Sequence, residues 1–240
     1  MNPAYSEEGE SVQAESTWTP GQLQDAGRGY LHLAWLLPLL TALFYAVFTL
    51  NLSLRQFVAP YALVFLMIFR CLRRTRPPSS ESGISSVFLC GLGVALLTPF
   101  LFFWRAAPTS LFFAINVLCH LVLSAVWLVT MHLHVLALAS DFHERYFQNE
   151  VRRNLFFVLA PIGLYAGIFL YMAHRDGLWD CETAVVLFHA VVLLKEGFVF
   201  LMIPYWITAF LLWHASGVAF RRALYSPPPT EPPLRNNSRA

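Results

Sequence analysis

The chain has 240 residues, of which 57% are hydrophobic and 12% are charged, and its formal net charge is +2. Soluble domains of this size carry about twice that share of charged residues, and the mean hydropathy is +0.55. This composition excludes a soluble enzyme, a nucleic-acid-binding protein and a disordered scaffold, because one water-facing core cannot bury so much apolar surface. It predicts an all-α, polytopic bundle of six to seven transmembrane helices.

Residues 1–29 are predicted to form an acidic cytosolic tail, which contains Glu7, Glu8, Glu10, Glu15, Asp25 and Arg28. A cleavable signal peptide has a basic start followed directly by an apolar core. This segment has the opposite order, so we expect the first hydrophobic run to remain in the membrane as an anchor.

The tail begins with an N-P-x-Y motif in which Asn2, Pro3 and Tyr5 are candidate trafficking residues. An Asn-Pro pair starts a turn that presents the tyrosine to phosphotyrosine-binding-type or endocytic adaptors. The alternative is an accidental match, since four residues are a short motif.

A bilayer core needs about 20 mostly apolar residues per helix. The predicted bundle covers residues 30–217, with spans at about 31–50, 57–72, 84–104, 111–139, 155–173 and 184–213. The last run would measure about 45 Å as one helix, which is long for one span and short for two. A break at Lys195-Glu196-Gly197 would divide it and raise the count to seven.

Two further recognition signals lie near the cytosolic face. Cys71, beside Arg70 and Arg73 at the end of the second span, is a candidate for palmitoylation. The proline-rich tail, residues 218–240, contains a segment of polyproline II character at 226–233, which could dock an SH3 or WW module. The alternative for this segment is a solvated tail without a partner.

Arginine placement predicts the orientation. With a cytosolic amino terminus and six spans, three arginines fall outside, namely Arg55, Arg105 and Arg175. The cytosolic side receives twelve: Arg28, Arg70, Arg73, Arg74, Arg76, Arg145, Arg152, Arg153, Arg221, Arg222, Arg235 and Arg239. The positive-inside rule therefore favours six spans with both termini cytosolic.

Two sequons, at Asn51 and Asn236, are potential glycosylation acceptors. With six spans, Asn51 lies at a helix end close to the bilayer and Asn236 is cytosolic, so we expect neither to be modified. Seven spans would place Asn236 in the lumen.

The fourth predicted span contains His120 and His134, which share one helical face because fourteen residues make close to four turns. The first interpretation is a polar stripe, with Asn116 and Ser124, that forms hydrogen bonds between helices. The alternative is a haem-bearing electron carrier, in which pairs of histidines on two helices hold haem. No second pair exists, so we predict neither a cofactor nor a metal.

Lys195 and Glu196 are adjacent charges inside the last apolar run, where ionisable groups are costly and indicate function. They are candidates for an ion path together with His120 and His134, and Glu196→Gln would then remove the pH dependence of flux. The alternative is a charged turn at the interface.

The chain contains no hydrolase, zinc-protease or phosphate-loop motif, which predicts that it is not an enzyme.

Three segments form a recognisable pattern: a basic turn, residues 70–78, follows a short second span, Asp141-Phe142 ends the fourth span, and Glu182-Thr-Ala precedes a final helix containing residues 188–198. In these segments the chain resembles the Bax-inhibitor (lifeguard-like) membrane family. In length, aromatic content and proline-rich tail the chain looks most like the cytomegalovirus seven-transmembrane set related to Bax inhibitors.

The resemblance implies a non-enzymatic multi-pass protein of a host endomembrane or plasma membrane. Members of the family lower surface levels of immune ligands or perturb calcium, so the implied partners are host membrane proteins. The alternative function is an ion-permeable calcium leak. The family's membrane aspartate is replaced here by Leu193, although Glu196 lies about one turn away.

Overall fold

The computed structural model describes residues 18–50, 54–76, 86–107, 110–142, 144–175, 177, 185, 189 and 198–225. Their regular structure is entirely helical. The helices are α1 (Pro20–Thr49), α2 (Leu54–Arg74), α3 (Ser86–Leu97), α4 (Pro99–Ala106), α5 (Leu111–Asp141), α6 (Arg145–Arg175) and α8 (Phe198–Tyr225).

Six of the described segments are long and apolar enough to cross a membrane. Helices α3 and α4 together form one of them, Ser86–Ala106. They are separated at Thr98 because Pro99 has no backbone N–H to continue the helical hydrogen bonds. The predicted all-α polytopic bundle is confirmed.

Several helix ends differ from the predicted spans. Helix α1 begins at Pro20, so residues 20–29 are helical rather than tail, because Thr19 and Gln22 form a capping box. The Gln22 N–H donates to the Thr19 hydroxyl at 3.3 Å, and the Thr19 N–H donates to the Gln22 side chain at 2.9 Å.

The last helix ends further along the chain than predicted. Helix α8 covers Phe198–Tyr225 and so ends at residue 225 rather than 213, and its final turns occupy the start of the predicted tail. Helix α6 begins at Arg145 rather than near residue 155, since its first turns are polar and extend beyond the apolar run. The predicted break at Lys195-Glu196-Gly197 lies outside the described residues.

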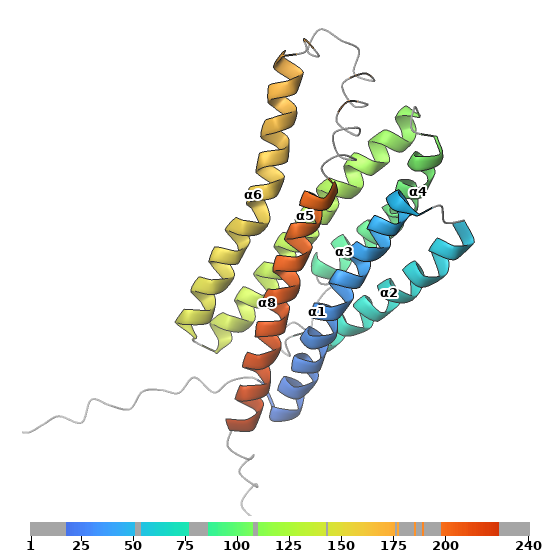
Figure 1. The fold of residues 1–240 in the computed structure, drawn as a ribbon. Coiled ribbons are helices and arrows are strands. Elements are labelled where there is room, and N and C mark those ends of the chain that lie inside the picture. The colour runs from blue at the N-terminus through green and yellow to red at the C-terminus, as the bar shows by residue number, and fades with distance from the viewer. Residues whose placement is uncertain are drawn as a thin grey trace, which may run out of the picture.

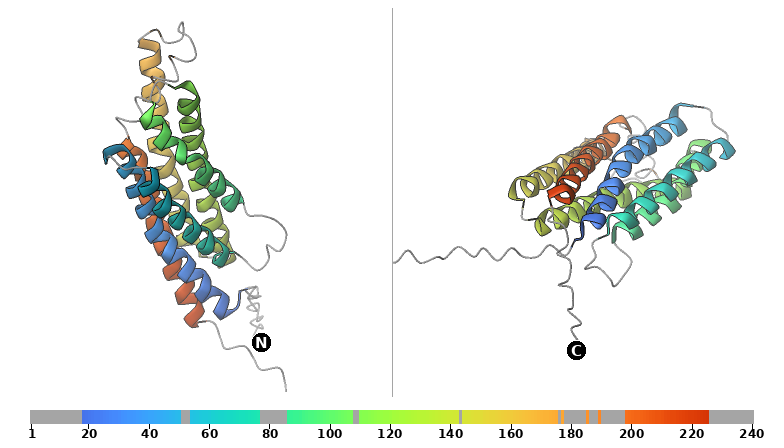
Figure 2. Two further views of the ribbon diagram at one scale, coloured as in Figure 1. Left: turned by 90° about the vertical axis from the view of Figure 1, so that its right-hand side faces the viewer. Right: turned by 90° about the horizontal axis from the view of Figure 1, so that it is seen from below.

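Both ends of the described chain lie at the same end of the bundle, where the start of α1 is beside the end of α8 (Figures 1 and 2). Helices α1, α3–α4 and α6 run away from this end, and α2, α5 and α8 return to it. We call it the terminal end. The helix directions place most described arginines there: Arg28, Arg70, Arg73, Arg74, Arg76, Arg145, Arg152, Arg153, Arg221 and Arg222. This arrangement supports six spans with both tails on the cytosolic side.

The opposite end of the bundle carries Arg105 and Arg175 in the last turns of α4 and α6. Arg105 donates hydrogen bonds to the backbone carbonyls of Val47 and Leu50. A cation is favourable there because the last carbonyls of a helix lack partners of their own. Arg105 thereby ties the end of α1 to the end of α4.

At the terminal end, the turn between α5 and α6 is held from two sides. The Trp18 indole N–H, just before α1, donates to Asp141 at 3.3 Å. The Arg222 guanidinium of α8 pairs with Glu144 at 3.2 Å, donates to the Phe142 carbonyl at 3.0 Å and lies over the Phe142 ring. The first and last spans are thus connected through this turn.

The shared position of both chain ends gives a prediction about glycosylation. When the protein is expressed in cells with an oligosaccharide transferase, glycosidase treatment should leave its mobility unchanged. Helix α8 ends at the terminal end, which the arginines predict to be cytosolic, and Asn51 comes directly after α1 in the sequence. We therefore expect that a lumenal enzyme reaches neither sequon. A mobility shift that disappears in Asn236→Gln would contradict this orientation.

Candidate functional site

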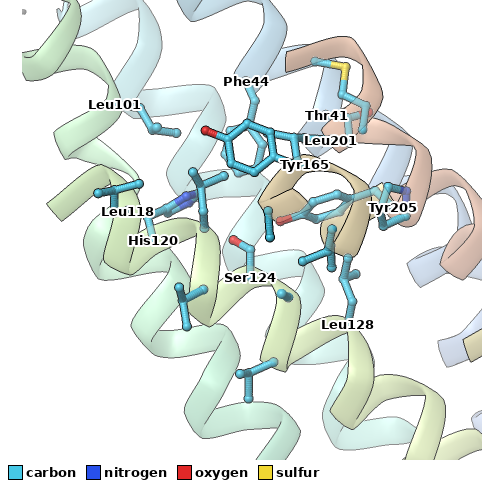
Figure 3. A pocket seen from close by; sticks show the side chains of 18 residues that line it. Thr41, Phe44, Leu101, Leu118, His120, Ser124, Leu128, Tyr165, Leu201 and Tyr205 are labelled. Atoms are coloured by element: carbon cyan, nitrogen blue, oxygen red, sulfur yellow. The ribbon is translucent and has the colours of Figure 1, made fainter. Parts of the chain in front are cut away.

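A cavity of about 360 Å³ lies inside the bundle, in the half further from the terminal end. Its walls come from α1, α4, α5, α6 and α8 (Figure 3). Most of the lining is aliphatic or aromatic, including Phe44, Leu101, Leu118, Leu128 and Leu201. The volume is in the range of small-molecule sites, which are typically apolar pockets with a few placed polar groups.

The first polar group of the cavity is the imidazole of His120, which is 2% exposed. Its Nε2 lies 3.0 Å from the Thr98 hydroxyl oxygen, and the Thr98 hydroxyl donates its single proton to the Val94 carbonyl at 2.7 Å. Thr98 can therefore only accept from the ring, so Nε2 carries the proton. In the neutral ring Nδ1 is then a bare acceptor, and this buried atom has no partner among the described residues.

Three further buried side chains of the lining carry a hydroxyl group. The hydroxyl of Thr41 donates to the Pro38 carbonyl at 2.7 Å, whereas the other two have no such bond. Ser124, one turn further along α5, is 5% exposed and Tyr205 of α8 is 6% exposed. Neither oxygen has a hydrogen bond of normal geometry to a described residue, although the two side chains lie close enough to interact. Figure 3 shows both groups with the His120 ring around the same cavity.

The cavity opens towards the lipid-facing side of the bundle between α5 and α6. Val122 and Val126 belong to its lining, yet they are 66% and 43% exposed. Helices α5 and α6 are joined at the terminal end and move apart towards the other end (Figure 1). The exposure of these two lining residues indicates that a molecule dissolved in the bilayer can reach the cavity from this side.

A second polar cluster, which the sequence analysis did not identify, connects α6 and α8. The His214 Nδ1 lies 2.9 and 2.8 Å from the two carboxylate oxygens of Glu150. The Glu150 side chain is 10% exposed and that of His214 is 32% exposed. Asn154, one turn from Glu150, is also buried. In the sequence, this cluster is indicated only by the i, i+4 spacing of Glu150 and Asn154, which places both polar residues on one face of α6.

The two histidines of the predicted ion path do not meet. They are separated by about 21 Å along α5, and the fully buried Trp127 lies between them. The His134 Nε2 bonds to the Thr75 carbonyl at 3.1 Å, and its ring lies 6.2 Å from that of Tyr30. Both histidines bond to other segments, as the polar-stripe interpretation predicts, whereas Asn116 donates within its own helix.

The other candidate residues are placed as follows. Cys71 is described, and its side chain is 6% exposed, so palmitoylation requires that its sulfur turn outwards. The trafficking residues Asn2, Pro3 and Tyr5, the sequons Asn51 and Asn236, and the charged pair Lys195 and Glu196 lie outside the described residues. The calcium-leak prediction therefore stays a prediction.

A haem held by two histidines would need a second imidazole facing His120, and among the described residues that line the cavity His120 is the single histidine. Within the described ranges, no group of three His, Cys, Asp or Glu side chains is arranged to hold a metal ion. The chemistry that these residues offer is hydrogen bonding inside an apolar cavity.

Comparisons with known proteins add no assignment, since no family model, no curated protein and no solved structure matches the chain. The resemblance to Bax inhibitors accordingly stays a prediction from the sequence. The structure shows a helical bundle in which six of the described segments are long and apolar enough to cross a membrane.

Proposed function

We propose that this is a non-enzymatic membrane protein that modulates other membrane proteins by helix-to-helix contact inside the bilayer. The observation that carries the proposal is the uncovered apolar face of α6. Only 6% of the most apolar stretch of α6 is buried inside the bundle, against 28–50% for the other five spans. Among the spans that the structure describes, α6 thus has the most surface available to a partner.

This face contains a G-x-x-x-G motif, formed by Gly163 and Gly167. Both residues are exposed, and a Cβ added at either would meet no atom within 4 Å. Small residues four apart let the backbone of a second transmembrane helix approach closely, where van der Waals packing drives association. Nothing within the described bundle uses these glycines, so their position favours a partner outside it.

The finer parts of the proposal rest on the sequence resemblance. They are that the chain is viral, that it resides in a host endomembrane or plasma membrane, and that its targets are immune ligands or other host membrane proteins. A contact made within the bilayer is consistent with a lower surface level of the target. A target bound in this way moves through the secretory pathway together with this protein, so the location of this protein decides how much of the target reaches the surface.

The test compares the cell-surface proteome of cells that express the wild-type chain or Gly163→Leu/Gly167→Leu. Wild type should lower a defined set of surface proteins, and the double variant should return that set to the level of untransfected cells, since the added side chains keep a partner helix away. Equal expression is verified by blotting.

The matched control is Gly217→Leu, because Gly217 of α8 is also exposed with open space at its Cβ position. It should lower the same surface proteins as wild type. An unchanged set in the double variant would refute the proposed role of α6. Cross-linking of two differently tagged copies shows whether the glycines serve self-association instead.

A further inference from the structure

We propose that the cavity lined by His120, Ser124 and Tyr205 binds a neutral membrane lipid through a single hydroxyl group. This goes beyond the proposed function, which concerns the outer face of α6. Three features of the cavity indicate the chemical class of the ligand: its polar atoms, its apolar lining and its opening.

The polar atoms of the cavity indicate that the ligand carries a hydroxyl group. The bare Nδ1 of His120 can only accept a hydrogen bond, so the ligand must offer a donor. The Ser124 and Tyr205 hydroxyls can donate as well as accept, so an oxygen that is itself an acceptor satisfies them. A hydroxyl group supplies both functions at one atom. All three protein groups are more than nine-tenths buried, and none of them makes a hydrogen bond of normal geometry to a described residue. Burying polar groups in this way costs free energy, which a ligand that bonds to them would recover.

The lining excludes a charged head group. The described residues that line the cavity include no Asp, Glu, Lys or Arg, and an isolated ionised group in apolar surroundings is strongly disfavoured. A phosphate or a carboxylate would also bring only acceptors to the His120 nitrogen. The ligand is therefore uncharged at the end that enters.

The rest of the cavity wall is apolar, which indicates that the remainder of the ligand is apolar and enters from the bilayer. Phe44 and Tyr205 pack edge to face with ring centroids 6.2 Å apart, and Phe44 also meets the His120 ring at 5.5 Å, so the polar atoms lie beside a rigid aromatic wall. The opening at Val122 and Val126 faces lipid. A volume of about 360 Å³ accepts a compact body or one chain. Sterols and diacylglycerols share this chemistry.

The experiment uses the purified full chain in nanodiscs and two photoreactive, alkyne-tagged probes, one a sterol and one a diacylglycerol. At least one probe should label the protein saturably, with the cross-link mapped to α5 or α8. An excess of the untagged parent lipid should remove the label, and the parent that competes identifies which of the two lipids binds.

The test variant is Ser124→Ala/Tyr205→Phe, which deletes two oxygens without changing the cavity walls. Its apparent affinity should fall about tenfold or more, as expected for the loss of two hydrogen bonds. The matched control, Ser216→Ala/Tyr30→Phe, removes a buried serine and a buried tyrosine hydroxyl outside the cavity and should bind as wild type does.

A third variant separates loss of ligand binding from loss of the fold. Ala166→Leu adds bulk from α6, where Ala166 lines the cavity and is exposed, and it should also abolish saturable labelling while leaving the elution profile unchanged. Saturable labelling that is equal in wild type and in the oxygen-deleting variant would overturn the proposal. So would the absence of saturable labelling by both probes, the result expected of a cavity that holds only water.

Discussion

The variant His214→Leu should unfold in detergent at a midpoint roughly 10 °C below that of wild type, equivalent to about 3 kcal/mol of lost stability. His214 is the residue that faces both oxygens of the buried Glu150 carboxylate. Removing it leaves a charge in apolar surroundings without its partner. We place the effect at the lower end of the range for buried pairs because His214 is itself 32% exposed.

A double variant separates loss of the pair from loss of packing. His214 also packs on Phe147, with ring centroids 5.2 Å apart, and leucine retains an apolar contact there. Glu150→Gln in the His214→Leu background should recover much of the lost stability, because a neutral amide needs no charged partner. His32→Leu, at an exposed position of α1, is the control and should change the midpoint little. No recovery in the double variant would show that the pair is not what stabilises this contact.

Trp127→Ala should destabilise the bundle by a similar amount, about 3 kcal/mol, measured by thermal unfolding monitored by circular dichroism. Trp127 is fully buried and stacks with Phe65 of α2 at 6.3 Å. Its indole also occupies the space beside Gly91 of α3, where an added Cβ would lie 2.9 Å from Nε1. Lipid tails are as apolar as the core, so the loss comes from packing rather than from transfer to water.

Gly91→Ala provides the matching test of this contact. Alone it should destabilise the protein, because its methyl group collides with the indole, whereas in the Trp127→Ala background it should be tolerated or improve stability. Trp206→Ala, at a position that is 58% exposed, is the control for removing an indole from a membrane span. Equal effects of Trp127→Ala and Trp206→Ala would contradict the structural role assigned to Trp127.

The candidate sites show where prediction from the sequence ends. His120 and Ser124 were predicted to share a polar face of α5, since that face follows from spacing along one helix. Tyr205 was not singled out, because an aromatic residue in an apolar run looks like ordinary core. The Glu150–His214 contact joins residues 64 positions apart. It could not be predicted, because the sequence pattern within α6 or α8 does not indicate how one helix is rotated relative to the other.

The sequence by itself determined the class of the protein and the approximate positions of its apolar spans, because both depend on the length and composition of single segments. Some helix ends were missed where a local device extended the helix past the apolar run, as the Thr19–Gln22 capping box does for α1. The tertiary structure decided which atoms surround the cavity and which remain without partners. It also decided which helix face stays uncovered. These properties are set by how the helices rotate and pack against one another. Helices such as α1, α5 and α8 are apolar on all sides, so their own sequences leave that rotation undetermined.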